Sequence, residues 1–317
     1  MEINLYDYVF NLVKQIPKGK ISTYKEIAIA LGDEISARAV GRILNCNENL
    51  NEIPCYRIIN SNGEIGGYKL GIEKKIDLLK KDGFEIENNR IKNFEKYVFK
   101  EFKTDFPLKK LRNLQEEMKR KIIIEDFYNF EKFCGVDVSY YGKCLNEKGI
   151  ACLVFNENKN FSKIFSERKI NFPYIPTYLF FREFPVIKEV IEKAIREGII
   201  EKEKTVILVD GNGILHPLNM GIASHIGVVM DIATIGVSKK LLCGKIKDNE
   251  IYLNGKKIGV KIKNIYVSPG HKISLETSVK IVKKFLKFKI PEQLRLAHIF
   301  ANEKRNEINR KNKKIEI

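Results

Sequence analysis

Three acidic residues in apolar surroundings are the first candidates for chemistry in this sequence. Asp210 ends the β-like run 205–209, Asp137 lies inside a β-branched and aromatic run, and Glu183 follows an aromatic one. Burying a carboxylate costs several kcal/mol unless it is paired or bound to a cation. Carboxylate oxygens suit Mg²⁺ or Mn²⁺, which support phosphodiester cleavage. Taken singly, each acid could instead lie in a solvated turn or pair with a core lysine.

Further motifs accompany these acids in a fixed order along the second part of the chain. They are residues 135–140, 173–176, 181–183, 210–213 with 216–217, 221–227, 235–239 and 268–271. With these motifs, residues 108–317 resemble endonuclease V, the repair nuclease that acts near deaminated bases such as hypoxanthine. The resemblance implies a ribonuclease H-like fold with Mg²⁺, or Mn²⁺, bound by Asp137, Glu183 and Asp210. It also implies that Lys239 and His271 lie near the metal and the scissile phosphate.

The same resemblance implies two elements that recognise the damaged base. Tyr174 is expected to act as a wedge in the duplex, and the prolines of 173–176 stiffen its loop. The displaced base would fit a recess lined by Gly211, Gly213, His216 and Leu242. One departure is Leu218, where the family usually has an arginine that could contact DNA or an acid.

The first 95 residues carry a separate set of motifs. Residues 22–32 have a helix N-cap, apolar spacing and a terminal glycine, and residues 36–44 continue as a second helix. This is helix-turn-helix spacing, which many helical pairs show without binding DNA. Cys55 follows in an apolar run, where a cysteine is either a core residue or a nucleophile.

In this order the motifs of residues 1–92 resemble the C-terminal domain of the O6-alkylguanine-DNA alkyltransferases. The resemblance implies that Cys55 accepts the alkyl group in a single, irreversible turnover. It implies that Arg38 enters the duplex to fill the gap left by the flipped guanine and that Tyr24 helps to rotate the nucleotide. Asn47 is expected to support the active-site turn.

The reactive-cysteine motif departs from the family because Tyr56 replaces its histidine. All four histidines of the chain belong to the second domain, so Cys55 has no histidine base from its own domain. A thiol with a pKa near ~8.5 is only slightly ionised at neutral pH, and a phenol is a poor base. A relay of Tyr56, water and Asp82, or assistance from Arg57, remains open. We expect Cys55 to be competent but weakly activated; alternatively, the domain is a non-catalytic module that binds alkylated bases.

The charge of the chain favours a polyanionic partner. Lys and Arg number 57 against 40 Asp and Glu, for a net charge of +17, and such an excess promotes salt-dependent binding to phosphates. We expect damaged double-stranded or single-stranded DNA as the partner, with inosine-containing RNA as an alternative. The sequence has no signal peptide pattern and no long apolar run, so we expect a cytoplasmic monomer without membrane contact. The absence of a Cys-x-x-Cys pair argues against a zinc site.

The predicted fold class is α/β in two domains. A small, mostly helical domain with a helix-turn-helix covers residues 1–95, residues 96–107 form a linker, and a mixed-sheet nuclease domain covers residues 108–317. Strands are expected at 132–140, 149–155, 161–169, 205–209 and 232–237, and helices at 178–198 and 217–230. The Lys-rich and Arg-rich tail after residue 303 is expected to be disordered.

Overall fold

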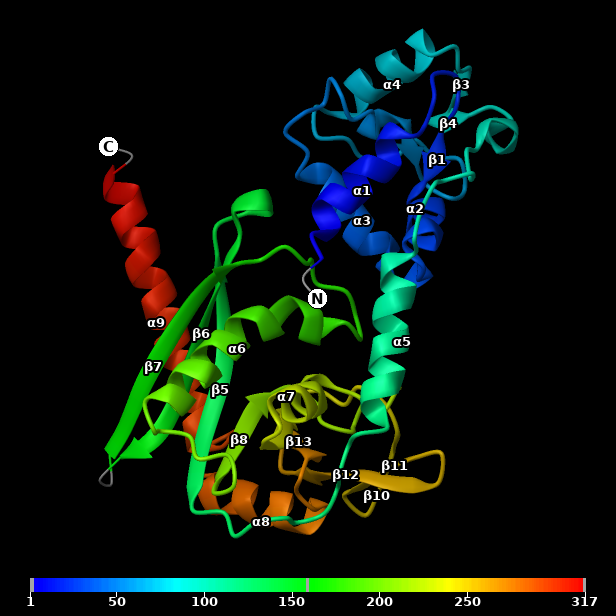
Figure 1. The fold of residues 1–317 in the computed structure, drawn as a ribbon. Coiled ribbons are helices and arrows are strands. Elements are labelled where there is room, and N and C mark those ends of the chain that lie inside the picture. Colours follow the sequence, from blue (N-terminus) through cyan, green and yellow to red (C-terminus); the bar gives the residue numbers. More distant parts are fainter. Residues whose placement is uncertain (1–2, 158–159, 316–317) are drawn as a thin grey trace. The chain divides into compact units, whose positions relative to one another are not determined.

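The computed structural model describes residues 3–157 and 160–315 of the chain (Figure 1). The chain forms two compact units. The first consists of Met1–Asn113 with Asn171–Pro176, and the second of Leu114–Ile170 with Thr177–Ile317. The division falls inside helix α5 (Pro107–Lys119). Within the described ranges, no helix combines the length and the apolar character that crossing a membrane would require.

The first unit is mostly helical, with short strands between the helices. Its elements are α1 (Leu5–Lys14), β1 (Ser22–Thr23), α2 (Tyr24–Leu31), η1 (Glu34–Ser36), α3 (Ala37–Asn45), η2 (Cys55–Arg57), β2 (Ile58–Ile59), α4 (Ile72–Lys81), β3 (Ile86–Glu87), β4 (Arg90–Ile91) and η3 (Phe94–Tyr97). β1 pairs with β2 in parallel, and β3 pairs with β4 in antiparallel. The start of α2 and the reactive-cysteine turn are therefore tied together by a β-bridge.

Local sequence signals set the bounds of the helix pair α2 and α3. The Thr23 hydroxyl accepts a hydrogen bond from the Glu26 amide, which caps the first turn of α2. Gly32 ends the helix with a φ of 100°, a conformation that glycine adopts without strain. Val40 and Ile43 bury the inner face of α3, while Arg38 on the same helix is exposed. The predicted helix pair is thus present with its basic face free.

The expected linker, residues 96–107, is hydrogen-bonded to the first unit for much of its length. The Phe99 amide donates to the Ile21 carbonyl at 2.6 Å, and the Lys103 amide donates to Gln15 Oε1 at 2.7 Å. The Thr104 hydroxyl donates to the Ala30 carbonyl. This segment therefore packs along the helical unit, and the boundaries 1–95 and 108–317 stay predictions.

The second unit is built on one nine-stranded mixed sheet with the order β10-β11-β12-β13-β9-β8-β5-β6-β7. Its strands are β5 (Lys132–Tyr141), β6 (Lys148–Glu157), β7 (Asn160–Lys169), β8 (Thr205–Asp210), β9 (Ala233–Ser238), β10 (Lys245–Lys247), β11 (Glu250–Leu253), β12 (Lys256–Ile262) and β13 (Ile265–His271). β5, β8 and β9 are parallel neighbours, whereas every other pairing is antiparallel. The five predicted strands occupy one continuous half of this sheet.

Helices cover both faces of the sheet (Figure 1). Helices α6 (Leu179–Arg196) and α7 (Ile222–Met230) pack on one face, where Val136, Ile207 and Val209 point. Helix α8 (Leu275–Phe285) and the start of α9 (Glu292–Ile315) pack on the other, with Val206 and Leu208. Because side chains alternate along a strand, each residue's position decides which helix it meets. This alternation positions the acidic residues of the site.

Two parts of this unit differ from the sequence prediction. Strands β10 to β13 and helix α8 were not predicted, because charged residues interrupt the apolar pattern of β10, β11, β12 and α8, and because Pro269 and Gly270 interrupt that of β13. The tail expected to be disordered is instead the last part of α9, so that prediction was wrong. Leu294, Ala297 and Ala301 form a narrow buried stripe that anchors this helix, and Lys311 pairs with Glu307 at helical spacing.

Candidate metal centre and candidate thiol site

The two aspartates predicted to hold a metal lie on adjacent parallel strands. Asp137 is in the second half of β5 and Asp210 is the last residue of β8, one step beyond the Val136 and Val209 pair. Both belong to the strand positions that face α9. Because parallel strands end at the same edge, the two carboxylates meet without any special loop.

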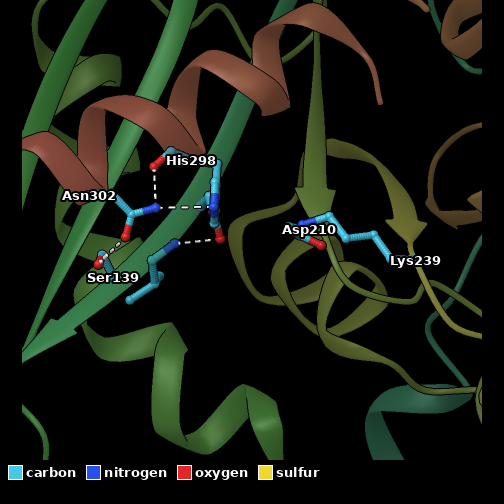
Figure 2. Close-up of polar contacts among 7 residues, drawn as sticks. Ser139, Asp210, Lys239, His298 and Asn302 are labelled. Atoms are coloured by element: carbon cyan, nitrogen blue, oxygen red, sulfur yellow. Dashed lines mark hydrogen bonds and ion pairs between the residues drawn. The ribbon is translucent and has the colours of Figure 1, made fainter. Parts of the chain in front are cut away.

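His298 of α9 completes this group. One oxygen each of Asp137 and Asp210 and one ring nitrogen of His298 all lie within 4.8 Å of one another. The His298 Nδ1 is 2.7 Å from Asp137 Oδ2. Figure 2 shows how Asn302 lies between His298 and Ser139: its amide nitrogen is 3.1 Å from His298 Nε2, and its oxygen accepts from the Ser139 hydroxyl at 3.0 Å. The imidazole is therefore held from both sides, and its hydrogen bond to Asp137 raises the pKa of His298.

Glu183 lies near the aspartates but outside that group of donors. It comes from α6, on the opposite face of the sheet, and its Oε1 accepts a hydrogen bond from the Tyr140 hydroxyl at 2.6 Å. Burial raises the pKa of Glu183 to about 8, and the charges of Asp137 and Asp210 act in the same direction. Three carboxyl groups thus lie close together in a partly buried site, an arrangement that a bound cation would stabilise.

Lys239 is placed beside the acids, whereas His271 is not. The Lys239 Nζ donates to Asp210 Oδ2 at 2.8 Å from its position directly after β9 (Figure 2). His271 is buried at the end of β13, where its Nδ1 accepts a hydrogen bond from the Ile123 amide. Its other ring nitrogen is 3.9 Å from Asp231 Oδ1. Among the described residues, the histidine whose ring nitrogen joins the two aspartates is His298.

Sequence reasoning missed His298 because its partner, Asp137, is 161 residues away in the chain. One available signal was the buried stripe Leu294, Ala297 and Ala301, which makes the surrounding segment an amphipathic helix. A histidine beside such a stripe lies at the border between core and surface, as His298 does with a side chain that is 52% exposed.

The residues expected to form the wedge and the recess differ in their exposure and in their hydrogen bonds. Tyr174 is 50% exposed between the buried residues Phe172 and Ile175, so its ring is available to a ligand. The backbone amides of Gly211 and Gly213 already donate, to the Val237 carbonyl at 3.0 Å and to Ser268 Oγ at 2.9 Å. These amides are therefore not available to donate hydrogen bonds to a base, and the loop could contact a base only through its surface.

The other two residues expected to line the recess differ in exposure, since His216 is buried and Leu242 is exposed. His216 is 4% exposed, and its Nδ1 accepts a hydrogen bond from the Leu218 amide. Leu218, which replaces the family's arginine, thus supports the loop with its backbone. Leu242 is 44% exposed in the loop between β9 and β10. Its apolar side chain is free to cover a ligand.

Cys55 is a buried thiol at the start of η2. Its Sγ accepts a hydrogen bond from Asn47 Nδ2 at 3.1 Å, and the same amide nitrogen lies 3.3 Å from the Ile53 carbonyl. Asn47 therefore holds the turn that carries the thiol. Burial raises the pKa of Cys55 to about 11, while Asn47, Lys75 and Lys69 oppose this rise. The thiol is protonated at neutral pH.

Tyr56 does not take the place of a base for Cys55. Its hydroxyl donates to Asp82 Oδ2 at 3.1 Å, and Arg57 Nε donates to the same oxygen at 2.7 Å. Burial and Asp82 both raise the pKa of Tyr56, so the phenol holds its proton more firmly than usual. In the relay of Tyr56, water and Asp82 that the sequence left open, Asp82 is already bound in a buried ion pair with Arg57.

A buried lysine supplies positive charge behind the thiol instead. Lys75 of α4 is fully buried, and its Nζ donates to the carbonyls of Ile58, Ile65 and Gly67 at 2.6, 2.6 and 3.2 Å. Burial lowers the pKa of Lys75 to about 8, but three carbonyl acceptors favour the ammonium form. Its charge is fixed near the reactive turn.

A pocket with a volume of about 470 Å³ opens in front of Cys55. Tyr24 at the start of α2 and Arg38 on α3 both line it. The remaining lining residues are Gly41, Arg42, Leu44, Asn45, Gly67, Tyr68 and Lys69. The first unit therefore combines a buried thiol, a recess and an exposed basic helix.

Both units match protein families that act on damaged DNA. Residues 116–299 match the family described as endonuclease V. Residues 4–84 match the DNA-binding domain of 6-O-methylguanine DNA methyltransferase. The fold and the site thus define a DNA-repair enzyme with two modules.

Relatives with the same two modules exist in other organisms. A protein of Picrophilus torridus named bifunctional methyltransferase/endonuclease is 41% identical over 93% of this chain and 95% of its own length. A Thermoplasma volcanium protein of the same name is 38% identical over 93% of this chain and 88% of its own. The chain therefore belongs to the bifunctional methyltransferase/endonuclease family, with an endonuclease V domain in its second part. The predicted combination of domains and the enzyme class are confirmed.

A solved structure supports the fold of the second part. Endonuclease V of Ciona intestinalis, in complex with a DNA 24mer containing an inosine followed by a ribo-adenosine, has a TM-score of 0.57 and 29% identity. The match covers 64% of this chain and all of that one (100%). Endonuclease V proteins are metal-dependent nucleases, and the acidic group described above is the corresponding feature here. The predicted fold class and DNA as a partner are confirmed.

Proposed function

We propose that the second domain nicks DNA near deaminated purines such as hypoxanthine and that it uses Mg²⁺, with Mn²⁺ as the alternative. The observation that carries this proposal is the convergence of Asp137 and Asp210, with Glu183 close behind. Asp137, Asp210 and Glu183 would hold the ion, and their oxygens form a donor set that suits Mg²⁺. The bound ion would offset the negative charge that gathers on the phosphate while water attacks.

Residues of the chain would prepare this reaction. His298 fixes the orientation of the Asp137 carboxylate through the 2.7 Å contact, and Asn302 fixes the imidazole. The Lys239 ammonium, which now pairs with Asp210, is free to move to a phosphate oxygen. Tyr174 would replace the displaced base in the stack, and the recess at His216 and Leu242 would hold that base. His271 has no role in this scheme.

Substitution of the aspartates tests the nuclease. Asp137→Asn and Asp210→Asn should each reduce Mg²⁺-dependent nicking of inosine-containing DNA by at least about a hundredfold, because a neutral amide is a poor ligand for the ion. Asp248→Asn removes a charge from an exposed turn and is the matched control. Nicking that persists in both site variants would remove the metal-site assignment.

We further propose that the first domain transfers the alkyl group of O6-alkylguanine to Cys55. The Cys55 sulfur attacks the alkyl carbon, and the carbon–sulfur bond forms as the carbon–O6 bond breaks. O6 keeps the electron pair, and the thiol proton passes through solvent to the base, which restores guanine. Water does not cleave the resulting thioether, so each molecule reacts once. Tyr24 would rotate the nucleotide, and Arg38 would fill the space it leaves.

Label transfer tests this step. DNA with radiolabelled O6-methylguanine should transfer its label to the wild-type chain and not to Cys55→Ala. Cys243→Ala, which removes a partly buried free cysteine of the other unit, should retain the transfer. Equal labelling of Cys55→Ala and wild type would refute the assignment.

One observation favours an alternative for the first domain, namely a module that binds alkylated bases without reacting. A pKa of about 11 for Cys55 and the commitment of Tyr56 to Asp82 leave the thiol without a base. Specific binding of O6-methylguanine DNA with no label on Cys55 after prolonged incubation would establish the alternative.

The nuclease substrate has its own alternative, inosine in RNA. The Ciona complex contains a ribo-adenosine after the inosine, and a metal site that cleaves phosphodiesters does not by itself exclude ribose. We propose DNA because both modules then act on one polymer. Competition between matched DNA and RNA strands measures the preference. A DNA-acting monomer also fits the cytoplasmic location expected from the sequence.

A further inference from the structure

The carboxylate of Glu183 is held by a tyrosine at the end of the central strand β5. The Tyr140 hydroxyl donates to Glu183 Oε1 at 2.6 Å, a separation typical of a strong hydrogen bond from a hydroxyl to a carboxylate. Within the described part of the chain, no other donor contacts this carboxylate. The second oxygen, Oε2, therefore has no hydrogen-bond partner there, and it is not a fully buried atom.

The Tyr140 ring is itself fixed from the side of α6. Side chains alternate along β5, so Tyr140 shares with Val136 the face that α6 covers. The guanidinium carbon of Arg182 on α6 lies 4.3 Å from the centre of the ring. Arg182 Nη2 also donates to Glu147 Oε1 at 2.8 Å, and only 9% of the Arg182 side chain is exposed. A planar cation thus lies against the phenol and restricts its movement.

This contact supplies what the third carboxylate otherwise lacks. The two aspartates of the metal group have charged or ring partners, Lys239 and His298. Glu183 reaches the group from a helix on the opposite face of the sheet, and a free glutamate side chain populates many rotamers. A ligand that has to be ordered when the ion binds lowers the affinity for that ion. The hydrogen bond from Tyr140 orders Glu183 before any ion arrives.

We propose that Tyr140 is a positioning residue of the metal centre, which holds Glu183 Oε1 and leaves Oε2 to bind a divalent cation. This inference rests on the proposed metal-dependent nicking. Removing the hydrogen-bond partner of a metal ligand typically lowers metal affinity by about tenfold or more. Tyr140 contacts neither the ion nor the DNA in this scheme, so it acts on metal affinity and not on the rate at saturating metal.

Direct titration with Mn²⁺ tests this role without nicking. The full-length chain, free of DNA, is titrated while the electron paramagnetic resonance signal of free Mn²⁺ is recorded. Binding that is lost in Asp137→Asn defines the site. Tyr140→Phe removes the hydroxyl alone and should raise the dissociation constant about tenfold. Tyr141→Phe removes the hydroxyl of the next residue, whose ring faces Lys148, and should bind Mn²⁺ like the wild-type chain.

Two further measurements separate positioning from a general loss of structure. In a Glu183→Ala background, where the two aspartates remain, Tyr140→Phe should not weaken Mn²⁺ binding further, because the hydroxyl acts through the carboxylate. Nicking of inosine-containing DNA by Tyr140→Phe should need about tenfold more Mg²⁺ and should reach the wild-type rate at saturating Mg²⁺. A rate that stays low at saturation, or an additive loss in the double variant, overturns the positioning role.

The outcomes also distinguish this inference from the proposed nuclease. Equal Mn²⁺ affinity of Tyr140→Phe and the wild-type chain overturns the inference, while loss of nicking in the aspartate variants still supports the reaction. If the wild-type chain binds no Mn²⁺ that Asp137→Asn abolishes, the proposed metal centre fails and the role of Tyr140 fails with it.

Discussion

At the scale of single residues, the first unit shows how a thiol is placed when its motif lacks a histidine. Cys55 receives a hydrogen bond from Asn47 and feels the charges of Lys75 and Lys69, yet burial still dominates its ionisation. Asp82, which could have accepted a proton, is bound by Arg57 and Tyr56. The thiol is therefore held in place but mostly protonated, and the fraction of thiolate would limit the rate of the proposed alkyl transfer.

This state of Cys55 predicts a steep pH profile for alkyl transfer. Because the pKa of the thiol is about 11, the thiolate fraction grows close to tenfold with each pH unit below that value. The single-turnover rate should rise accordingly between pH 7 and 9 and should show no plateau there. Stopped reactions with O6-methylguanine DNA measure the rate. A plateau reached near neutral pH would mean that another group activates the thiol, and Lys75→Met would then identify or exclude Lys75.

At the scale of elements, α9 packs on the sheet with one face and contacts the acidic group with another. Its buried stripe anchors the helix on β5 and β6, and His298 with Asn302 faces the acidic group. Arg305 lies seven residues after His298, close to two helical turns, and so shares the face that carries the imidazole. The Arg305 guanidinium contacts the side chain of Asn306, and it has no carboxylate partner in the described ranges. We infer that α9 extends the site toward the substrate backbone.

This geometry predicts a phosphate contact by Arg305. Arg305→Ala should weaken binding to damaged and undamaged DNA alike and should reduce the slope of log K against log salt concentration by about 1. Binding titrations at several salt concentrations measure that slope. Lys311→Ala is the matched control, because Lys311 pairs with Glu307 at 2.7 Å and should contribute less. Equal slopes for Arg305→Ala and wild type would contradict the contact.

The elements also show what the sequence could predict. The sequence predicted the five strands β5 to β9 because their apolar residues are continuous or alternate. It also indicated Asp137 and Asp210, because these acids interrupt or end such runs. β10, with the exposed sequence Lys245 to Lys247, and the polar turns of α9 carry no such signal. His298 and the commitment of Asp82 to Arg57 depend on contacts between distant segments, which no local pattern encodes.

At the scale of the whole molecule, two kinds of chemistry are separated into two units of one chain. The proposed thiol reaction uses residues of the helical unit, and the metal ligands of the proposed strand scission all belong to the sheet unit. The net charge of +17 serves both, because each must first approach phosphates. The two proposed reactions share DNA as the partner and no catalytic group.

This separation predicts opposite responses to a chelator. EDTA should abolish nicking of inosine DNA, because the negatively charged Asp137 and Asp210 cannot offset the charge on the phosphate without the ion. EDTA should leave label transfer to Cys55 intact. Both activities are measured on one preparation, before and after Mg²⁺ is restored. Loss of label transfer in EDTA would show that the thiol reaction also depends on a divalent ion.

The loop after β8 restricts how this enzyme can change its specificity. A Cβ atom at Gly213 would lie 2.0 Å from the Pro269 carbonyl oxygen, and one at Gly236 would lie 2.1 Å from the Gly213 nitrogen. The backbone segments that contain Gly213, Gly236 and Pro269 therefore pack with no room for a side chain at either glycine. We expect any larger residue at these two positions to be destabilising. In the recess proposed for the displaced base, substitutions that alter specificity are therefore expected at exposed positions such as Leu242.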